Sequence, residues 1–116
     1  MIQLKRAYEA AEGADGYRVL VDRLWPRGVT KAKARVDLWL KEVAPSDAAR
    51  KSFGHDPEKW GEFQRRYGRE LDEKADLLRR LKELEREHKT LTLLFAAKDE
   101  ERNNAVVLKA RLAGRR

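Results

Sequence analysis

Side chains that could bind or transform an anion gather at the end of an apolar run early in the chain. The run at 17–21 leads directly into Asp22 and Arg23, and Arg27 follows shortly after. Guanidinium groups present planar forks of N–H donors that match phosphate and carboxylate groups. An aspartate beside such cations stays ionised, so it can act as a general base or orient a water molecule. This segment therefore predicts an anion site that contains an acid/base group.

A second, longer apolar run ends in the same kind of chemistry. The run at 90–97 leads into Lys98 and Asp99, and the asparagines Asn103 and Asn104 come next. A helix that opens at the asparagines would add backbone N–H donors for an anion, and Lys98 would supply electrostatic stabilisation. Ligands of open α/β sheets bind at the carboxyl ends of strands. We therefore expect both groups to face one cleft if the two runs are neighbouring strands.

These residues divide into a catalytic set and a ligand-binding set. The catalytic candidates are Asp22, Lys98 and Asp99, and the ligand-binding candidates are Arg23, Trp25, Arg27, Asn103 and Asn104. A structural interpretation stays open for the aspartates: Asp22 could pair with Lys98 or an arginine to tie the sheet edge together, and Asp99 could cap a helix. Trp25 stands between two arginines and suits a ligand contact and loop packing equally well.

The cysteine and histidine content limits the chemistry. The chain has no cysteine, which excludes disulfides, thiolate catalysis and a cysteine zinc site. The histidines, His55 and His88, lie far apart in the sequence, and two scattered histidines do not make a metal site. We predict no metal, and no motif identifies a cofactor.

Length and hydropathy bound the class of protein. The 116 residues suit a single domain over 1–116. Hydrophobic and charged residues each make up 41%, enough for one core with a heavily solvated surface. The first residues lack the apolar core of a signal peptide, and no run approaches the roughly 20 apolar residues that cross a membrane. The expected protein is cytoplasmic, with no membrane contact.

The net charge of +7 is unevenly distributed. Residues 23–51 contain eight Lys or Arg and three Asp or Glu, and residues 109–116 contain four Lys or Arg and no acid. Such clustering favours an anionic small molecule or a nucleic acid as partner. The alternative is that these charges only make the surface soluble.

Apolar periodicity predicts strands and helices in a mixed order. Strand patterns occur near 2–8, 17–21, 36–40 and 90–97, the third of which also fits a helix. Helix patterns occur at 47–53 behind the cap Ser46, near 57–72, near 74–88 and at 105–112. The link between the first two strands is short, so they form a hairpin or are joined by a bare loop. We predict that the strands near 17–22 and 91–97 are adjacent, with the helices near 57–72 and 74–88 packed on the sheet.

Three segments, 19–28, 54–60 and 96–108, together resemble the domain-of-unknown-function family 488, in its short, YeaO-like branch. The resemblance covers essentially the whole chain and implies an α/β fold with a mainly parallel sheet, in which 36–40 is a strand. It implies no established activity. The expected architecture is a small three-layer sandwich, with a sheet of about four strands flanked by helices.

One position departs from the family pattern. Longer branches carry a Lys-Asp pair followed by a Cys-His pair, and the short branch is expected to carry Asn-His there. Here Lys98 and Asp99 match, but Asn103 and Asn104 occupy the Cys-His position. An amide is neither a nucleophile nor a proton carrier near neutral pH. A mechanism that needs a histidine at this point is therefore in doubt.

The function predicted is a phosphate- or carboxylate-binding cleft at the strand carboxyl ends that acts on a nucleotide or nucleic-acid component. Two alternatives remain: a non-catalytic, basic nucleic-acid-binding module, and a structural protein that docks on a partner through an exposed helix. No helix-turn-helix spacing supports a transcription factor. The sequence leaves open whether the protein is an enzyme and which oligomeric state it adopts.

Overall fold

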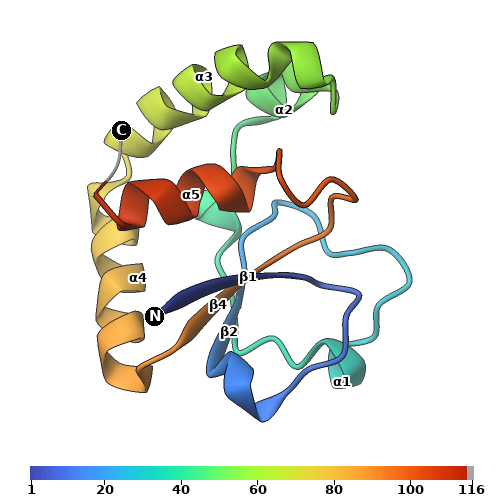
Figure 1. Cartoon of the computed structure of the whole chain (residues 1–116), viewed down its shortest axis with the longest axis vertical. Coiled ribbons are helices and arrows are strands. Elements are labelled where there is room, and N and C mark those ends of the chain that lie inside the picture. Colours follow the sequence, from blue (N-terminus) through green and yellow to red (C-terminus); the bar gives the residue numbers. More distant parts are fainter. Residues whose placement is uncertain (115–116) are drawn as a thin grey trace.

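Four parallel strands form one sheet in the order β1-β4-β2-β3 in the computed structural model, which describes residues 1–114 (Figure 1). The strands are β1 (Ile2–Arg6), β2 (Tyr17–Leu20), β3 (Leu38–Trp39) and β4 (Leu91–Phe95). The predicted adjacency of the second and last runs is confirmed, because Val19 pairs with Leu93. The predicted strand at 36–40 is present but is only two residues long. Arg115 and Arg116, part of the basic segment 109–116, lie outside the described residues.

Residues 1–114 contain five α-helices, of which four follow the predicted patterns closely and the short α1 was not predicted. They are α1 (Lys31–Ala34), α2 (Asp47–Phe53), α3 (Trp60–Asp72), α4 (Ala75–His88) and α5 (Asn104–Leu112). The Ser46 side chain caps α2 by accepting a hydrogen bond from the backbone N of Ala49, as a serine before a helix should. Within residues 1–114, none of these helices has the length and apolar character needed to cross a membrane. The α/β fold with a parallel sheet of four strands is confirmed.

The two faces of the sheet carry cores of unequal size. Side chains alternate along a strand, so Leu91 and Leu93 point to one face and Leu94 to the other. The first face is covered by α4 and α5, and α3 adds side chains to the same core. The buried side chains of these three helices include Phe63, Tyr67, Leu71, Leu81, Leu84, Leu108 and Leu112. The second face is covered by α1 and by loops, around a smaller cluster of Ala7, Leu20 and Leu94 with Trp25, Val36 and Trp39 packed against it.

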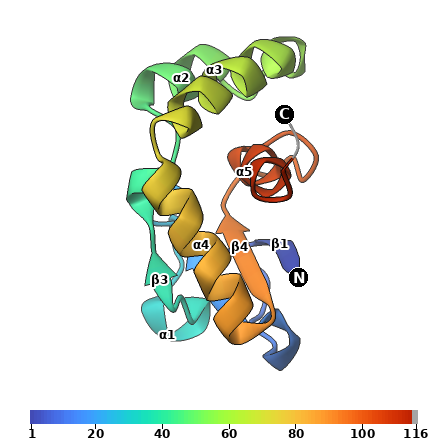
Figure 2. The same cartoon turned by 90° about the vertical axis from the view of Figure 1, so that its left-hand side faces the viewer.

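One predicted packing is wrong in part. Helix α4 lies across β2 and β4 as expected, but α3 packs mainly against α2 and α5, beyond the carboxyl end of the sheet (Figure 2). The apolar face of α3 meets α2 through stacked rings of Phe53 and Phe63, whose centroids are 4.6 Å apart. The hydroxyl of Tyr67 donates to the backbone O of Val43 at 2.6 Å, which ties α3 to the segment that leads into α2. The helix pair therefore overhangs the edge at which the site residues emerge.

The first two strands are joined by a loop and do not form a hairpin. Strand β4 lies between β1 and β2, and all three run in the same direction. The loop contains a short 3-10 helix, Gly13–Asp15, and ends at Gly16, where φ is 64°. A parallel neighbour cannot be reached by a tight turn, so the chain must return along the length of the sheet.

Candidate functional site

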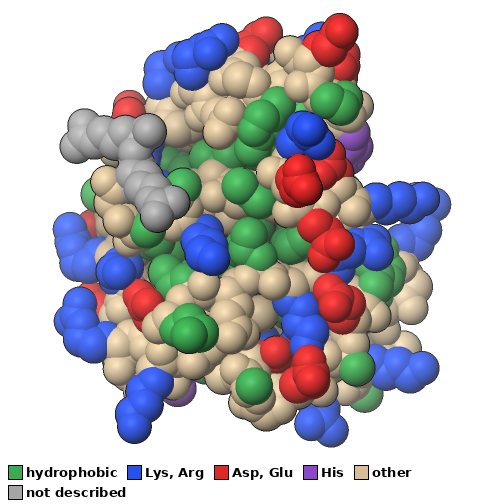
Figure 3. Space-filling model, in the orientation of Figure 1, with side chains coloured by type: hydrophobic (Ala, Val, Ile, Leu, Met, Phe, Trp, Pro, Cys, Tyr) green, Lys and Arg blue, Asp and Glu red, His purple; other side chains and the backbone are tan. Residues whose placement is uncertain are grey.

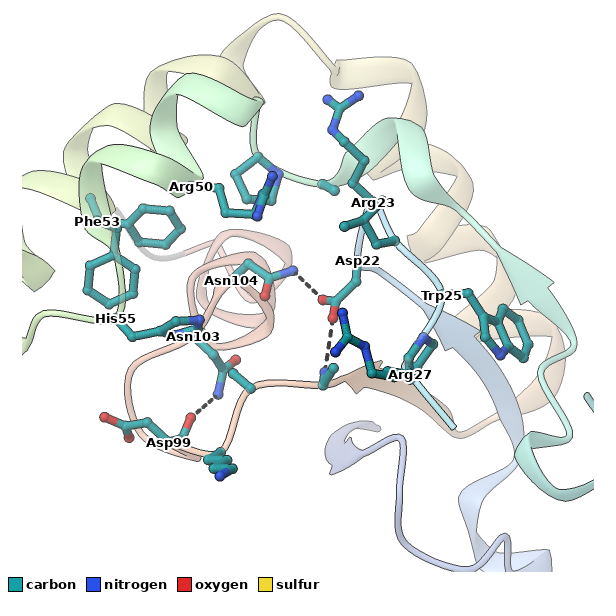
Figure 4. A pocket seen from close by; sticks show the side chains of 18 residues that line it. Asp22, Arg23, Trp25, Arg27, Arg50, Phe53, His55, Asp99, Asn103 and Asn104 are labelled. Carbon is teal, nitrogen blue, oxygen red and sulfur yellow. Dashed lines mark hydrogen bonds between the residues drawn. The ribbon is translucent and has the colours of Figure 1, made fainter. Parts of the chain in front are cut away.

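A cavity of about 720 Å³ lies at the carboxyl end of the sheet, under the overhanging helices (Figure 4). Its volume falls within the roughly 300–1,000 Å³ range of small-molecule sites. It is lined by all eight predicted site residues: Asp22, Arg23, Trp25, Arg27, Lys98, Asp99, Asn103 and Asn104. The sequence expectation that the two strand ends face one hollow thus agrees with the geometry, because β2 and β4 are parallel neighbours.

Asp22 lies at the centre of this arrangement without a cationic partner. Its Oδ2 accepts a hydrogen bond from the backbone N of Ala96 at 2.9 Å, and its Oδ1 accepts one from Nδ2 of Asn104 at 3.1 Å. Burial raises the pKa of the Asp22 carboxyl above its ordinary value, against the lowering effect of those two hydrogen bonds and of the nearby His55. Among residues 1–114 it forms no ion pair, so the expected pairing with Lys98 or an arginine is not observed. Asp22 ties the strand ends together through an amide and a backbone N–H instead.

Asp99 was a candidate helix cap, but Asn103 caps α5 and Asp99 accepts hydrogen bonds in the preceding turn. Asp99 Oδ1 accepts hydrogen bonds from the backbone N of Glu101 and of Arg102, within the turn before α5. These bonds, the one from Glu101 foremost, hold the pKa of the Asp99 carboxyl below its ordinary value. The N-cap of α5 is Asn103, whose side chain accepts a bond from the backbone N of Val106 at 3.0 Å. Asp99 is therefore a turn former, and the helix cap is its neighbour.

The cations of the cavity come from three separate segments. Arg23 and Arg50 approach the same oxygen of Asp47, at 3.6 Å from Arg23 Nε and 3.3 Å from Arg50 Nη2. Arg27 and Lys98 are exposed, and within the described part of the chain neither makes an ion pair. The cavity thus has two cations that are free to meet a ligand and two that are held by one exposed carboxylate.

Trp25 lines the cavity, but its ring is turned toward the sheet. The indole Nε1 donates to the backbone O of Val29 at 2.7 Å, and the ring meets that of Trp39 edge-on at 5.5 Å between centroids. Figure 4 shows the ring directed away from Asp22. These contacts favour loop packing, the second of the two roles considered for Trp25.

The sequence analysis missed the side of the cavity that α2 and α3 provide. Arg50, Phe53, His55 and Phe63 line it, and Figure 4 shows Phe53 and His55 across the cavity from Asp22 and Arg27. Arg50 could have been found from its position in the basic stretch 23–51, which favours an anionic partner. His55 adopts a positive φ of 59°, a conformation that non-glycine residues seldom take. No sequence pattern indicated that α3 would extend past the sheet and bring these residues in.

The donor set does not resemble a metal centre. Within residues 1–114, no three His, Cys, Asp or Glu side chains come together in a way that could hold a metal ion. The polar lining instead consists of two carboxylates and two amides, all engaged in hydrogen bonds, together with the four cations and the imidazole of His55. The arrangement is suited to binding an anion by charge and N–H donors.

Comparison with known proteins agrees with the residues that carry the resemblance. Residues 1–115 match the family described as "Inactive DUF488-N3 subclade". The chain belongs to the DUF488 family. Among its DUF488 relatives, uncharacterised protein YeaO of Escherichia coli (strain K12) is 43% identical over 107 residues, which span 92% of the chain and 92% of YeaO. The expected membership of family 488, with similarity to YeaO, is confirmed.

Other DUF488 relatives extend the match along the chain. Uncharacterised protein Rv3073c of Mycobacterium tuberculosis (strain ATCC 25618 / H37Rv) is 40% identical over 114 residues, 98% of the chain and 95% of the relative. Uncharacterised protein Mb3100c of Mycobacterium bovis (strain ATCC BAA-935 / AF2122/97) matches with the same identity and coverage. No solved structure matches the chain significantly.

Proposed function

We propose that this protein binds a phosphate- or carboxylate-bearing small molecule in the cavity at the carboxyl end of its sheet, and does not convert it. The observation that carries the proposal is the lining itself. Four cations (Arg23, Arg27, Arg50 and Lys98) border a hollow whose other walls include Pro26, Pro45, Phe53 and Phe63. A largely apolar pocket with a few convergent polar groups is the usual form of a small-molecule site.

The absence of turnover is supported by what the polar groups already do. Asn104 occupies the position at which longer branches of the family are expected to carry histidine. Its Nδ2 donates to the backbone O of Val21 and to Asp22. Asp99 is occupied by the turn before α5. The family's own description, "Inactive", points the same way. Of the catalytic candidates, Asp22 and Lys98 remain. In this proposal they orient the ligand and balance its charge.

Removing one free cation from the cavity should weaken anion binding without disturbing the fold. Arg27 is exposed, and within residues 1–114 it makes no hydrogen bond through its side chain, so Arg27→Ala should unfold at nearly the same temperature. A charge-assisted hydrogen bond contributes about 1.5–3 kcal/mol, so the affinity for pyrophosphate should fall about tenfold or more. Titration calorimetry with pyrophosphate measures this change.

The matched control is Arg79→Ala, which removes the same charge from α4, where Arg79 pairs with Asp76 at the surface. It should leave pyrophosphate affinity unchanged. Equal losses for both variants would mean that net charge, and not the cavity, attracts the anion. If Arg27→Ala no longer unfolds in a cooperative transition, Arg27 is instead needed for the stability of the fold.

A second candidate, nucleic-acid binding without turnover, is favoured by one feature of the surface. Lys31, Lys33 and Arg35 are exposed on and just after α1, and Figure 3 shows basic side chains projecting from the edge along which the segment before α1 runs. Acidic side chains lie nearer the centre of that face, which limits a polyanion to the edge. In the basic C-terminal segment, Arg111 is already bound to Asp72 and to the backbone O of Gly68.

Salt dependence distinguishes this second candidate from the first. Binding of single-stranded RNA through α1 should weaken steeply between about 50 and 200 mM salt, because each neutralised phosphate releases counterions. The triple variant Lys31→Ala, Lys33→Ala and Arg35→Ala should abolish it, and Arg27→Ala should reduce it only slightly. RNA affinity that is independent of salt, or absent at 50 mM salt, removes the candidate.

A further inference from the structure

The cavity contains the carboxylate of Asp22 as a hydrogen-bond acceptor, which is unusual for an anion site. Asp22 presents a carboxylate, and Asn104 turns its Nδ2 toward Val21 and Asp22. The amide oxygen of Asn104 accepts no hydrogen bond from residues 1–114, and Figure 4 shows it on the side away from Asp22. A ligand must therefore meet the carboxylate here, although cations surround it elsewhere.

The hydrogen bonds to Asp22 are those of an ionised carboxylate. Both known partners, the backbone N of Ala96 and Nδ2 of Asn104, are donors, one to each oxygen. A carboxylate has about four lone-pair positions and donates nothing, so positions remain for donors from a ligand. The negative charge also repels an anionic group, which must lie against the arginines. The group that reaches Asp22 must carry N–H or O–H donors.

The opposite wall is suited to a planar ring. Phe53 and Phe63 line the cavity with stacked rings that are largely buried, and the exposed His55 adds a third ring at the rim, with its centroid 6.0 Å from that of Phe53. Aromatic walls stabilise flat, conjugated ligands, as in sites that stack nucleic-acid bases. The cavity volume of about 720 Å³ is large enough for a ring and an attached phosphate.

We propose that the ligand is a guanine nucleotide, whose ring lies against Phe53 and His55 and whose N1–H and N2–H₂ donors meet the carboxylate of Asp22. Guanine is the common base that presents two adjacent donors on its pairing edge, which fits a carboxylate. Adenine presents an acceptor, N1, where guanine presents N1–H, and that atom would face the Asp22 charge. The phosphate meets Arg23, Arg27, Arg50 and Lys98. This inference rests on the proposed function, because it takes the cavity to be an anion site.

A nucleotide series on the unmodified protein tests the inference. Titration calorimetry with GMP, IMP and AMP should rank them in that order, because IMP lacks the N2 donor and AMP brings an acceptor to Asp22. GMP should bind at least about tenfold more tightly than AMP, because adenine N1 and the Asp22 carboxylate are both acceptors and the charged hydrogen bond from guanine N1–H is lost. Phosphoserine, which combines a phosphate with an ammonium group and has no ring, should bind more weakly than GMP.

The variant Asp22→Asn examines the same contact from the side of the protein. It should remove the preference for GMP over AMP, and it should raise pyrophosphate affinity because a negative charge that repels the anion is gone. Asp76→Asn, at an exposed aspartate of α4, is the control and should change neither. If Asp22→Asn fails to fold, the nucleotide series on the unmodified protein decides alone.

The outcomes separate this inference from the proposal beneath it. AMP binding as tightly as GMP, or phosphoserine binding as tightly as GMP, overturns the guanine assignment. Pyrophosphate binding that depends on Arg27, with no nucleotide binding, also overturns it and leaves the anion site intact. If neither pyrophosphate nor any nucleotide binds, both proposals fail.

Discussion

Replacing Gly16 by alanine is expected to destabilise the fold by about 3 kcal/mol or more, from backbone strain and overpacking together. Gly16 has φ 64° and ψ −132°, a combination that side chains resist. A Cβ at this position would lie 2.3 Å from the backbone O of Thr90 and 2.8 Å from its Cβ. Neither atom can move freely, because that same Thr90 O accepts the hydrogen bond from the backbone N of Tyr17 at 3.0 Å. Urea denaturation measures the change in the free energy of unfolding.

The matched control for this glycine is three residues away in the same loop. Gly13→Ala meets nothing within 4 Å, and Gly13 has no positive φ. Its free energy of unfolding should therefore stay within about 0.5 kcal/mol of the unmodified protein, as for most surface changes. Similar losses for the two variants would mean that the loop as a whole, and not the approach of Gly16 to β4, carries the stability.

Removing the buried carboxylate of Asp15 should cost about 3 kcal/mol, because it leaves buried positive charge without a partner. Asp15 and Arg18 are both buried, and Arg18 Nη1 donates to Asp15 Oδ2. Lys5 Nζ donates to both oxygens of Asp15 at 3.2 Å. Arg18 also donates to the backbone O of Ala34, so it joins this network to the end of α1. The variant Asp15→Ala should loosen α1 as well as the first loop, which urea denaturation and amide hydrogen exchange would detect.

The contribution of Asp15 should also depend on pH with a definite sign. Burial by itself raises the pKa of the Asp15 carboxyl, but hydrogen bonds from the backbone N of Glu12, from Lys5 and from Arg18 outweigh burial and hold that pKa below its ordinary value. A depressed pKa in the folded state stabilises the protein above the unfolded value of about 3.9, and the gain is lost as the pH falls through the folded value. The difference in unfolding free energy between the unmodified protein and Asp15→Ala should therefore be larger at pH 7 than at pH 3.

The control for Asp15 is Asp76→Ala. Asp76 pairs with Arg79 at the same sequence spacing of three, but its side chain is 93% exposed. An exposed pair of this kind contributes about 0–1 kcal/mol. A loss for Asp76→Ala equal to that for Asp15→Ala, or a difference that does not shrink at acid pH, would contradict the role given to burial.

Local patterns predicted the elements well because each rests on neighbouring residues. The cap at Ser46 begins α2 as expected, and the helix expected near 57–72 buries Phe63, Tyr67 and Leu71 on one face. Trp60, at the start of the same stripe, is only partly buried, because it lies at the free end of α3. The short strand at Leu38–Trp39 was predicted too long, since only two residues there pair with β2.

In the candidate site, too, some features could be predicted from local sequence and others could not. Asp22, Arg23, Arg27, Lys98 and Asp99 could be found from the sequence, because a polar group directly after an apolar run marks the end of a strand, and parallel strands end at one edge. Their hydrogen-bond partners could not be found in this way. Asp22 is bound to Asn104 and Ala96 instead of to a cation. Two nearby arginines pair with other carboxylates, Arg102 with Asp99 and Arg23 with Asp47.

Composition, periodicity and family resemblance were therefore enough to specify a basic α/β chain with a parallel sheet and a polar cluster at the ends of two strands. The second wall of the cavity was not specified, because it depends on how α3 packs against α2 and α5, and α5 lies far from α3 in the chain. That packing brings Arg50, Phe53 and His55 opposite Asp22 and turns an exposed strand edge into an open hollow with two walls. Hydrophobic patterns state which face of a helix is buried, but the partner of that face is chosen by the three-dimensional fit of the whole core.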